Sequence, residues 1–317
     1  KEKKKRINWK RFRRRLAAFL IVAAIGTGYW YYAWEYRAET EPETELTETN
    51  TDPVYTMERY LRTLKRNSTV YEYACDEDEA DEEFGTYVVP GLKATRTIQY
   101  KKEGTPHVCT SMTPQGLAIT EDYVLISAYC RTKEHNSVIY VIDKKTHEYV
   151  KEIVLGTRAH VGGMAYDAMN HKLWITGQGS TWAQANAITL KHLESYDFTE
   201  NYQPIEFDLS YNLYRIQRAS FMTYHDGALF VGFFTKDNAS IIEKYLINAD
   251  GTLYEKSDMN LKRTVGVIDP VACAVSMQVI SGKVQGMAFY NNKILLTISW
   301  GIMPSEVQIF NYSRYGI

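Results

Sequence analysis

Four similar segments of the chain carry polar or basic side chains at equivalent positions, and together these could bind an anion. The first position holds Thr113, His160, Arg218 and Lys283. The second position, two residues later, holds Gln115, Gly162, Ser220 and Gln285. Imidazole, guanidinium and ammonium groups that converge on one spot would focus a positive potential suited to a carboxylate or a phosphate. The competing interpretation is that these are ordinary solvent-exposed loop residues.

Aromatic residues form a second candidate set. They come after the second apolar stretch of each segment: Tyr129, Trp182, Phe233, Phe234 and Trp300. Rings grouped on one face would suit stacking on a glycan or contact with a protein partner. Packing between neighbouring sheets is the alternative role.

The four cysteines are Cys75, Cys109, Cys130 and Cys273. None has the C-x-x-C spacing of a metal or redox site, so no metal ligand is predicted. A hairpin that turns at residues 121–122 would place Thr113 opposite Cys130, with Cys109 four residues before Thr113. This register predicts a disulfide between Cys109 and Cys130. Buried, reduced thiols are the alternative.

Signals for catalysis are weak. The chain has no G-x-S-x-G elbow, and neither His107 nor His160 belongs to an H-x-x-H or H-E-x-x-H motif. A Ser-His-Asp triad assembled from distant residues stays open. No catalytic residue and no cofactor are therefore predicted.

The elements that must position these residues repeat along the chain. Inner strands begin near Gln115, Gly162, Ser220 and Gln285, at spacings of 47, 58 and 65 residues. Second strands follow at 123–129, 172–177, 228–234 and 293–299, and third strands at 137–143, 185–190, 240–247 and 305–310. Outer strands are predicted at 148–155 and 204–209. Repeated antiparallel sheets predict an all-β fold, a β-propeller with four clear blades. Residues 86–101 and 262–283 are expected to close the ring as a fifth blade.

The repeat resembles known propellers in its blade pattern. G-L-A at 116–118 and G-M-A at 163–165 and 286–288 precede strands such as L-W-I-T at 173–176. This pattern resembles bacterial YVTN-type and NHL-type propellers, and more distantly gluconolactonase/regucalcin propellers, over about residues 86–317. The resemblance implies the fold. Gluconolactonase-like propellers hold a divalent metal with Glu, Asn and Asp at the inner strand starts, and the matching positions here have no carboxylate, so the resemblance does not extend to a metal lactonase.

The N-terminal part predicts a membrane anchor. Residues 1–15 hold ten Lys/Arg and form a basic cytoplasmic tail, and residues 16–34 are an uncharged stretch of nineteen residues that could span a bilayer. A cleaved signal peptide is the alternative, although aromatic residues stand where a cleavage site would be. Residues 35–52 read as an acidic linker, and residues 53–85 as a short amphipathic helix and an acidic loop that pack on the domain. The run at 76–83 lacks the pattern of a calcium loop.

These patterns predict the function and location of the chain. Without residues 1–15 the chain has 27 basic and 37 acidic residues, a net charge of about −10, which argues against binding nucleic acid. The positive-inside rule places the C-terminal domain outside the cell membrane. The sequence therefore predicts a single-pass, extracellular binding or scaffold module for a cell-surface protein, a polymer or an anionic ligand. The alternative is an extracytoplasmic hydrolase or lyase whose site lies at the channel mouth.

Overall fold

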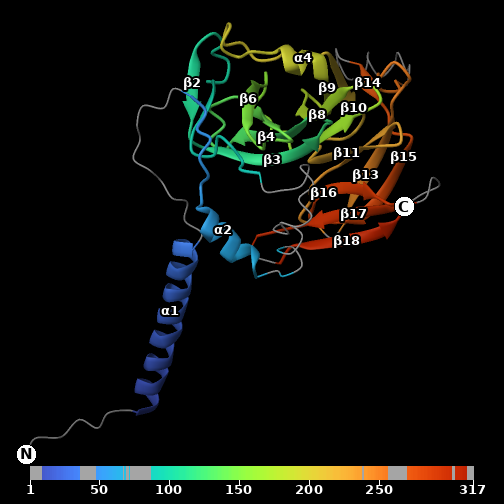
Figure 1. The fold of residues 1–317 in the computed structure, drawn as a ribbon. Coiled ribbons are helices and arrows are strands. Elements are labelled where there is room, and N and C mark those ends of the chain that lie inside the picture. Colours follow the sequence, from blue (N-terminus) through green and yellow to red (C-terminus); the bar gives the residue numbers. More distant parts are fainter. Residues whose placement is uncertain are drawn as a thin grey trace, which may run out of the picture.

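The computed structural model describes residues 9–35, 48–66, 68, 71, 87–237, 239–255, 270–301 and 304–312. Helix α1 (Trp9–Glu35) extends away from the rest of the chain, and helix α2 (Met57–Leu64) lies where the chain reaches the C-terminal domain (Figure 1). The domain is built from strands, with α4 (Leu190–Ser195) at its periphery. Four of its sheets are arranged as the blades of a propeller, which confirms the predicted all-β fold.

Each blade is a run of antiparallel strands that starts on the inside of the ring. Blade 1 comprises β3 (Met112–Ile119), β4 (Tyr123–Cys130), β5 (Val138–Asp143) and β6 (Tyr149–Val154). Blade 2 comprises β7 (Met164–Asp167), β8 (Lys172–Gln178), β9 (Ala183–Thr189) and β10 (Leu209–Leu213). Blade 3 comprises β11 (Phe221–His225), β12 (Ala228–Gly232), β13 (Ala239–Leu246) and β15 (Ser276–Ser281). Blade 4 comprises β16 (Val284–Tyr290), β17 (Lys293–Ile298) and β18 (Glu306–Asn311).

Alternate residues of a strand contribute to different hydrophobic cores. In β4, Leu125 packs with Leu173 and Ile175 of blade 2, whereas Val124 and Ile126 pack on the opposite side of the sheet. Successive side chains of a strand point to opposite faces, so a sheet covered on both faces needs apolar residues at nearly every position. This explains why β4 is so continuously apolar.

The chain leaves blade 3 before completing it. After β13, residues Val271–Ala272 form β14, which pairs in parallel with β10 at the outer edge of blade 2. The chain then returns to blade 3, where β15 pairs with β13 as the outermost strand. Blade 2 therefore has five strands, and blades 2 and 3 are linked by this excursion.

A fifth blade is not found among the described residues. Residues Thr95–Ile98 form β1, which pairs with β2 (Pro106–Cys109) in a separate two-stranded sheet beside blade 1. Residues 86–101 therefore do not form a blade with 262–283, because their strand β1 pairs with β2 instead. The described part of 262–283 contributes β14 and β15 to blades 2 and 3, so it does not form a new blade either.

The predicted membrane-spanning helix is not supported. In the described part of the chain, no helix is both long and apolar enough to cross a bilayer. Helix α2 is capped by the Thr56 hydroxyl, which accepts a hydrogen bond from the backbone N–H of Arg59. Cys75 and the acidic run at 76–83 lie outside the described residues.

Candidate functional site at the channel mouth

The starts of the inner strands lie against one another around the propeller axis. Strand β3 contacts β7, β7 contacts β11, and β11 contacts β16. Glycines permit the closest approaches: a Cβ atom on Gly116 would lie 2.8 Å from the carbonyl oxygen of Gly162, and one on Gly162 would lie 2.5 Å from that of Ser220. Such distances leave no room for a side chain, so the first three blades touch through their backbones. We call the rim formed by these strand starts the channel mouth.

His160 lies at the centre of the described contacts at the mouth. Its ring stacks on Tyr129, with the ring centroids 3.9 Å apart and an interplanar angle of 18°. Tyr129 stands opposite Thr113 in the β3–β4 ladder. The structure therefore brings together three of the predicted residues, two from blade 1 and one from the start of blade 2.

Positive charge surrounds His160. Burial lowers the pKa of its imidazole, and the charges of Lys133 and Arg218 lower the pKa further because they repel a protonated ring. Lys133 belongs to the loop after β4 in blade 1, and Arg218 precedes β11 of blade 3. Lys133 was missed in the sequence because it lies outside the repeated positions.

The predicted residues of blade 4 join the mouth less closely. Lys283 has a positive φ of 64°, and its backbone N–H donates to the carbonyl of Thr235 in blade 3. The Gln285 side chain donates to the carbonyl of Ser299 within its own blade. The Lys283 contact ties blade 4 to blade 3, whereas the Gln285 contact stays within blade 4. The described contacts do not join either side chain to His160.

The predicted aromatic residues do not form one patch. Trp182 is buried and packs edge-on against Tyr214. Phe234 lies 5.5 Å from Trp300, centroid to centroid, and the Lys236 ammonium lies 4.6 Å from the centroid of Trp300. Phe233 is half-buried. Packing between elements therefore accounts for Trp182, whereas Tyr129 belongs to the mouth.

A groove of 640 Å³ lies between α2 and the domain. Most of its surface is apolar, with Tyr55, Met57 and Val88 on one part of the wall. Met112, Thr113 and Pro114 at the start of β3 form another part. Thr113 thus borders both this groove and the residues gathered at the mouth.

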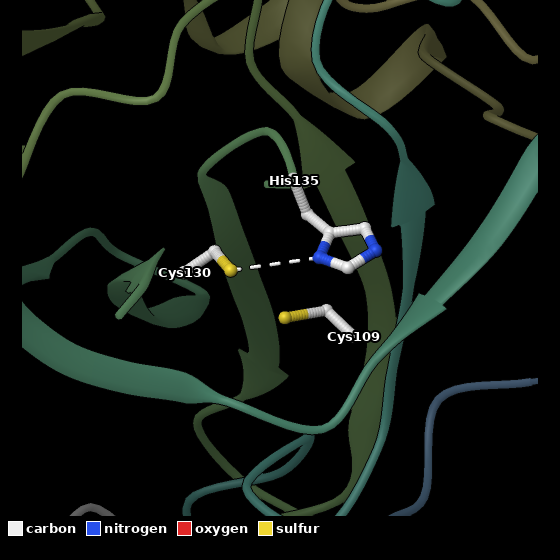
Figure 2. A group of neighbouring side chains, drawn as sticks. All are labelled: Cys109, Cys130 and His135. Atoms are coloured by element: carbon white, nitrogen blue, oxygen red, sulfur yellow. Dashed lines mark hydrogen bonds between the residues drawn. The ribbon is translucent and has the colours of Figure 1, made fainter. Parts of the chain in front are cut away.

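Cys109, Cys130 and His135 form a separate, buried cluster where the small β1–β2 sheet meets blade 1 (Figure 2). One donor atom from each lies within 4.8 Å of the other two. The Cys130 sulfur is 3.5 Å from His135 Nδ1 and 3.0 Å from the Thr132 hydroxyl. Both thiols are free, so the structure shows no disulfide between these cysteines. A β-bulge in β3 places Met112, and not Thr113, opposite Cys130.

The two thiols differ in acidity. Burial raises the pKa of Cys109 to about 12. Burial acts in the same direction on Cys130, but hydrogen bonds from Thr132 and from His135 outweigh it and lower the pKa of that thiol to about 6. One buried sulfur is therefore prepared to carry a negative charge.

A His–Asp pair lies elsewhere, and its histidine, His192, lines a cleft of 820 Å³ beside α4. His192 Nδ1 is 3.0 Å from Asp208 Oδ1. The nearby Ser195 hydroxyl donates to the His192 backbone carbonyl and not to its ring. Asp208 also accepts from the backbone N–H of Thr189, the residue that caps α4, so the pair secures the start of this helix. This arrangement lacks the serine–imidazole contact of a catalytic triad.

No known protein family matches the sequence, and no curated protein matches it. Among solved structures, the chain is similar to Kuenenia stuttgartiensis hydrazine synthase, with 12% identity, a TM-score of 0.39, and coverage of 64% of this chain and 52% of that one. It is also similar to the β-propeller domain of the trilobed protease from Pyrococcus furiosus, with 7% identity, a TM-score of 0.33, and coverage of 64% of this chain and 56% of that one. A third similar structure is TolB from Acinetobacter baumannii, with 10% identity, a TM-score of 0.35, and coverage of 71% of this chain and 51% of that one. The matches span about half the length of these chains. They do not extend to activity, and the strand pairing described above establishes the four-bladed propeller.

Proposed function

We propose that this propeller is a binding module that holds a small anionic ligand, a carboxylate or a phosphate, at the channel mouth. One observation carries the proposal: the chain segments that hold His160 and Arg218 touch at the mouth, where a Cβ on Gly162 would lie 2.5 Å from the carbonyl oxygen of Ser220. The charges of Arg218 and of Lys133 in blade 1 also lower the pKa of His160. Like charges repel, so such a group costs free energy unless an anion joins it. The ring of Tyr129 supports His160 from one side, which fixes the direction in which its imidazole faces.

The groove beside α2 adds a second property to the site. Because Thr113 borders both regions, an anion with an apolar portion could place its charge near His160 and its apolar part among Met57, Tyr60 and Val88. The cell-surface location, the membrane attachment at residues 16–34 and the partner stay predictions of the sequence. The mouth would bind an anion with or without an anchor.

Titration of the purified chain with phosphate and with citrate, followed by calorimetry, tests this function. We expect saturable binding that weakens as salt is added, because exposed charges are screened. The variant Arg218→Gln should bind about ten-fold more weakly, in line with the loss of one charge-assisted hydrogen bond. The control Lys191→Gln removes one positive charge from α4 and should bind normally. If both variants lose affinity equally, overall charge and not the mouth explains the binding.

A further inference from the structure

The buried cluster in blade 1 contains more donor atoms than a disulfide would use. Cys109 has 0% of its surface exposed, Cys130 has 1% and His135 has 7%. A disulfide between the cysteines would leave the His135 imidazole buried beside two sulfur atoms that accept hydrogen bonds poorly. All three side chains point toward one another, Cys109 from the small sheet and the other two from blade 1 (Figure 2).

The spacing of these donors matches that required around one metal ion. Zinc–sulfur bonds are ~2.3 Å and zinc–nitrogen bonds are about 2.0–2.1 Å, so tetrahedral ligand atoms lie roughly 3.5–3.8 Å from each other. The Cys130 sulfur is 3.5 Å from His135 Nδ1. No pair of donor atoms in the cluster is more than 4.8 Å apart. A shift of about 1 Å at the widest pair would close the set around an ion.

The neighbours of the cluster orient its donors as outer-shell partners do in metal sites. His135 Nε2 is 2.7 Å from Nδ1 of His107. Metal binding requires the tautomer in which Nε2 carries the proton and donates to His107, because Nδ1 is then free of hydrogen; this exchanges the Nδ1–H···S hydrogen bond to Cys130 for a metal bond. The Thr132 hydroxyl, 3.0 Å from the Cys130 sulfur, can donate to it. Such hydrogen bonds stabilise thiolate ligands.

We infer that Cys109, Cys130 and His135 bind a thiophilic metal ion, Zn(II), with His107 as the positioning residue for His135. Two thiolates and one imidazole are the ligands that zinc prefers, and three protein ligands leave one tetrahedral position for water. The segment from Cys130 to His135 has four intervening residues, which is a spacing typical of chelating loops.

A metal here would add a further connection between the small sheet and blade 1, which already share a hydrophobic core. Cys109 ends β2 of the small sheet, Cys130 ends β4, and His135 lies in the loop that follows. His135 also forms a β-bridge with Gln99, just after β1. Zinc would therefore fasten the small sheet to blade 1, and the melting temperature should rise with zinc concentration.

Cobalt substitution tests the site without any mutation. The full-length chain is purified under reducing conditions, treated with a chelator and titrated with Co(II), whose thiolate complexes are coloured. We expect one ion per chain with thiolate-to-cobalt charge-transfer absorption, and displacement of Co(II) by Zn(II). A reduced and folded chain that binds no Co(II) overturns the inference, as does native protein in which Cys109 and Cys130 form a disulfide.

Variants then assign the ligands. Cys109→Ser and Cys130→Ser should each abolish the charge-transfer absorption, and His107→Gln should weaken zinc binding about 10–100-fold while the absorption persists. The matched controls Cys273→Ser and His171→Gln should leave the affinity unchanged. Circular dichroism of each metal-free variant verifies that it is folded. Retention of the absorption in the Cys109→Ser, Cys130→Ser double variant would exclude this site.

Discussion

Blades 1 and 4 have the same inner three-strand arrangement, yet they differ in what covers them. The outer strand of blade 1 is overlaid by residues near Thr49 and by β1, and Glu152 accepts hydrogen bonds from Thr49 and Arg96 there. In blade 4, β18 is the outermost strand among the described residues, and Val307 and Ile309 are 58% and 62% exposed. Both candidate sites include residues of blade 1, the blade whose outer strand is covered.

We expect the largest difference in stability between the two blades from the carboxylate of Glu152, which binds the segments that pack on the outer strand of blade 1. Glu152 is 2% exposed, and its Oε1 is 2.7 Å from Arg96 Nε. Glu152→Gln should lower the free energy of unfolding by about 3 kcal/mol, the lower end for a broken buried ion pair, because Arg96 is partly exposed. The matched variant Glu306→Gln in the exposed strand β18 should change it by less than about 0.5 kcal/mol. Denaturant unfolding measures the free energy of unfolding of both variants. Equal effects would show that the segments of Thr49 and Arg96 add no stability by packing on blade 1.

A second contrast concerns glycines at equivalent positions in blades 1 and 4. A Cβ on Gly116 would lie 2.8 Å from the backbone oxygen of Gly162, whereas one on Gly286 would meet only the Thr297 hydroxyl within 4 Å, at 2.9 Å. Gly116→Ala should therefore destabilise by about 1–3 kcal/mol, since the backbone must move. Gly286→Ala should cost less, because a hydroxyl can rotate away. Thermal unfolding of the two variants would contradict this explanation if Gly286→Ala proved the more harmful.

The smallest effect is a pH dependence that blade 4 should lack. In the folded chain the pKa of His160 is lower than its ordinary value of 6.5. At pH values between 6.5 and the folded pKa, the unfolded chain therefore binds more protons than the folded chain. The stability contributed by neutral His160 is present above that window and is lost as pH falls to its folded pKa. Arg218→Gln should raise the pKa of His160 toward 6.5, because one of the lowering charges is gone.

Titration of the His160 ring by NMR follows this shift directly. The variant His160→Gln should show a flatter change of stability with pH across the same window. Added phosphate should raise the pKa of His160, because a bound anion favours the protonated ring. If the pKa of His160 is unchanged in Arg218→Gln and also in the presence of phosphate, then neither the charge of Arg218 nor that of phosphate acts on His160.

The blades and their strands could be predicted because repeated alternation has a local cause in the pleat of a strand. The strands predicted at 137–143 and 293–299 form β5 and β17 almost as expected. The sequence could not predict which sheets residues 262–283 join. Pairing of β14 with β10 depends on which blade has an unpaired edge strand in the folded domain, and not on the alternation of apolar residues within the segment. The helix expected to span a membrane at 16–34 is not supported, since no helix among the described residues is both long and apolar enough to cross a bilayer.

The sequence indicated some candidate site residues and missed others, because only residues at repeated positions can be recognised from the periodicity. Equivalent positions identified His160 and Arg218, because rotation about the propeller axis relates them. Lys133 and His135 occur once, in a loop outside the repeat, so nothing in the periodicity indicates them. The spacing from Cys130 to His135 is the signal that a search limited to C-x-x-C does not detect.

The excursion through β14 has a consequence for how this domain folds. In most repeat proteins each repeat contacts only its sequence neighbours, and the array can unfold from an end. Here β15 follows β14 in the chain but belongs to blade 3, so blade 3 gains its outer strand only through a segment that is held by blade 2. Blades 2 and 3 should therefore exchange their amide hydrogens as one cooperative unit, with pairings distant in sequence that slow folding.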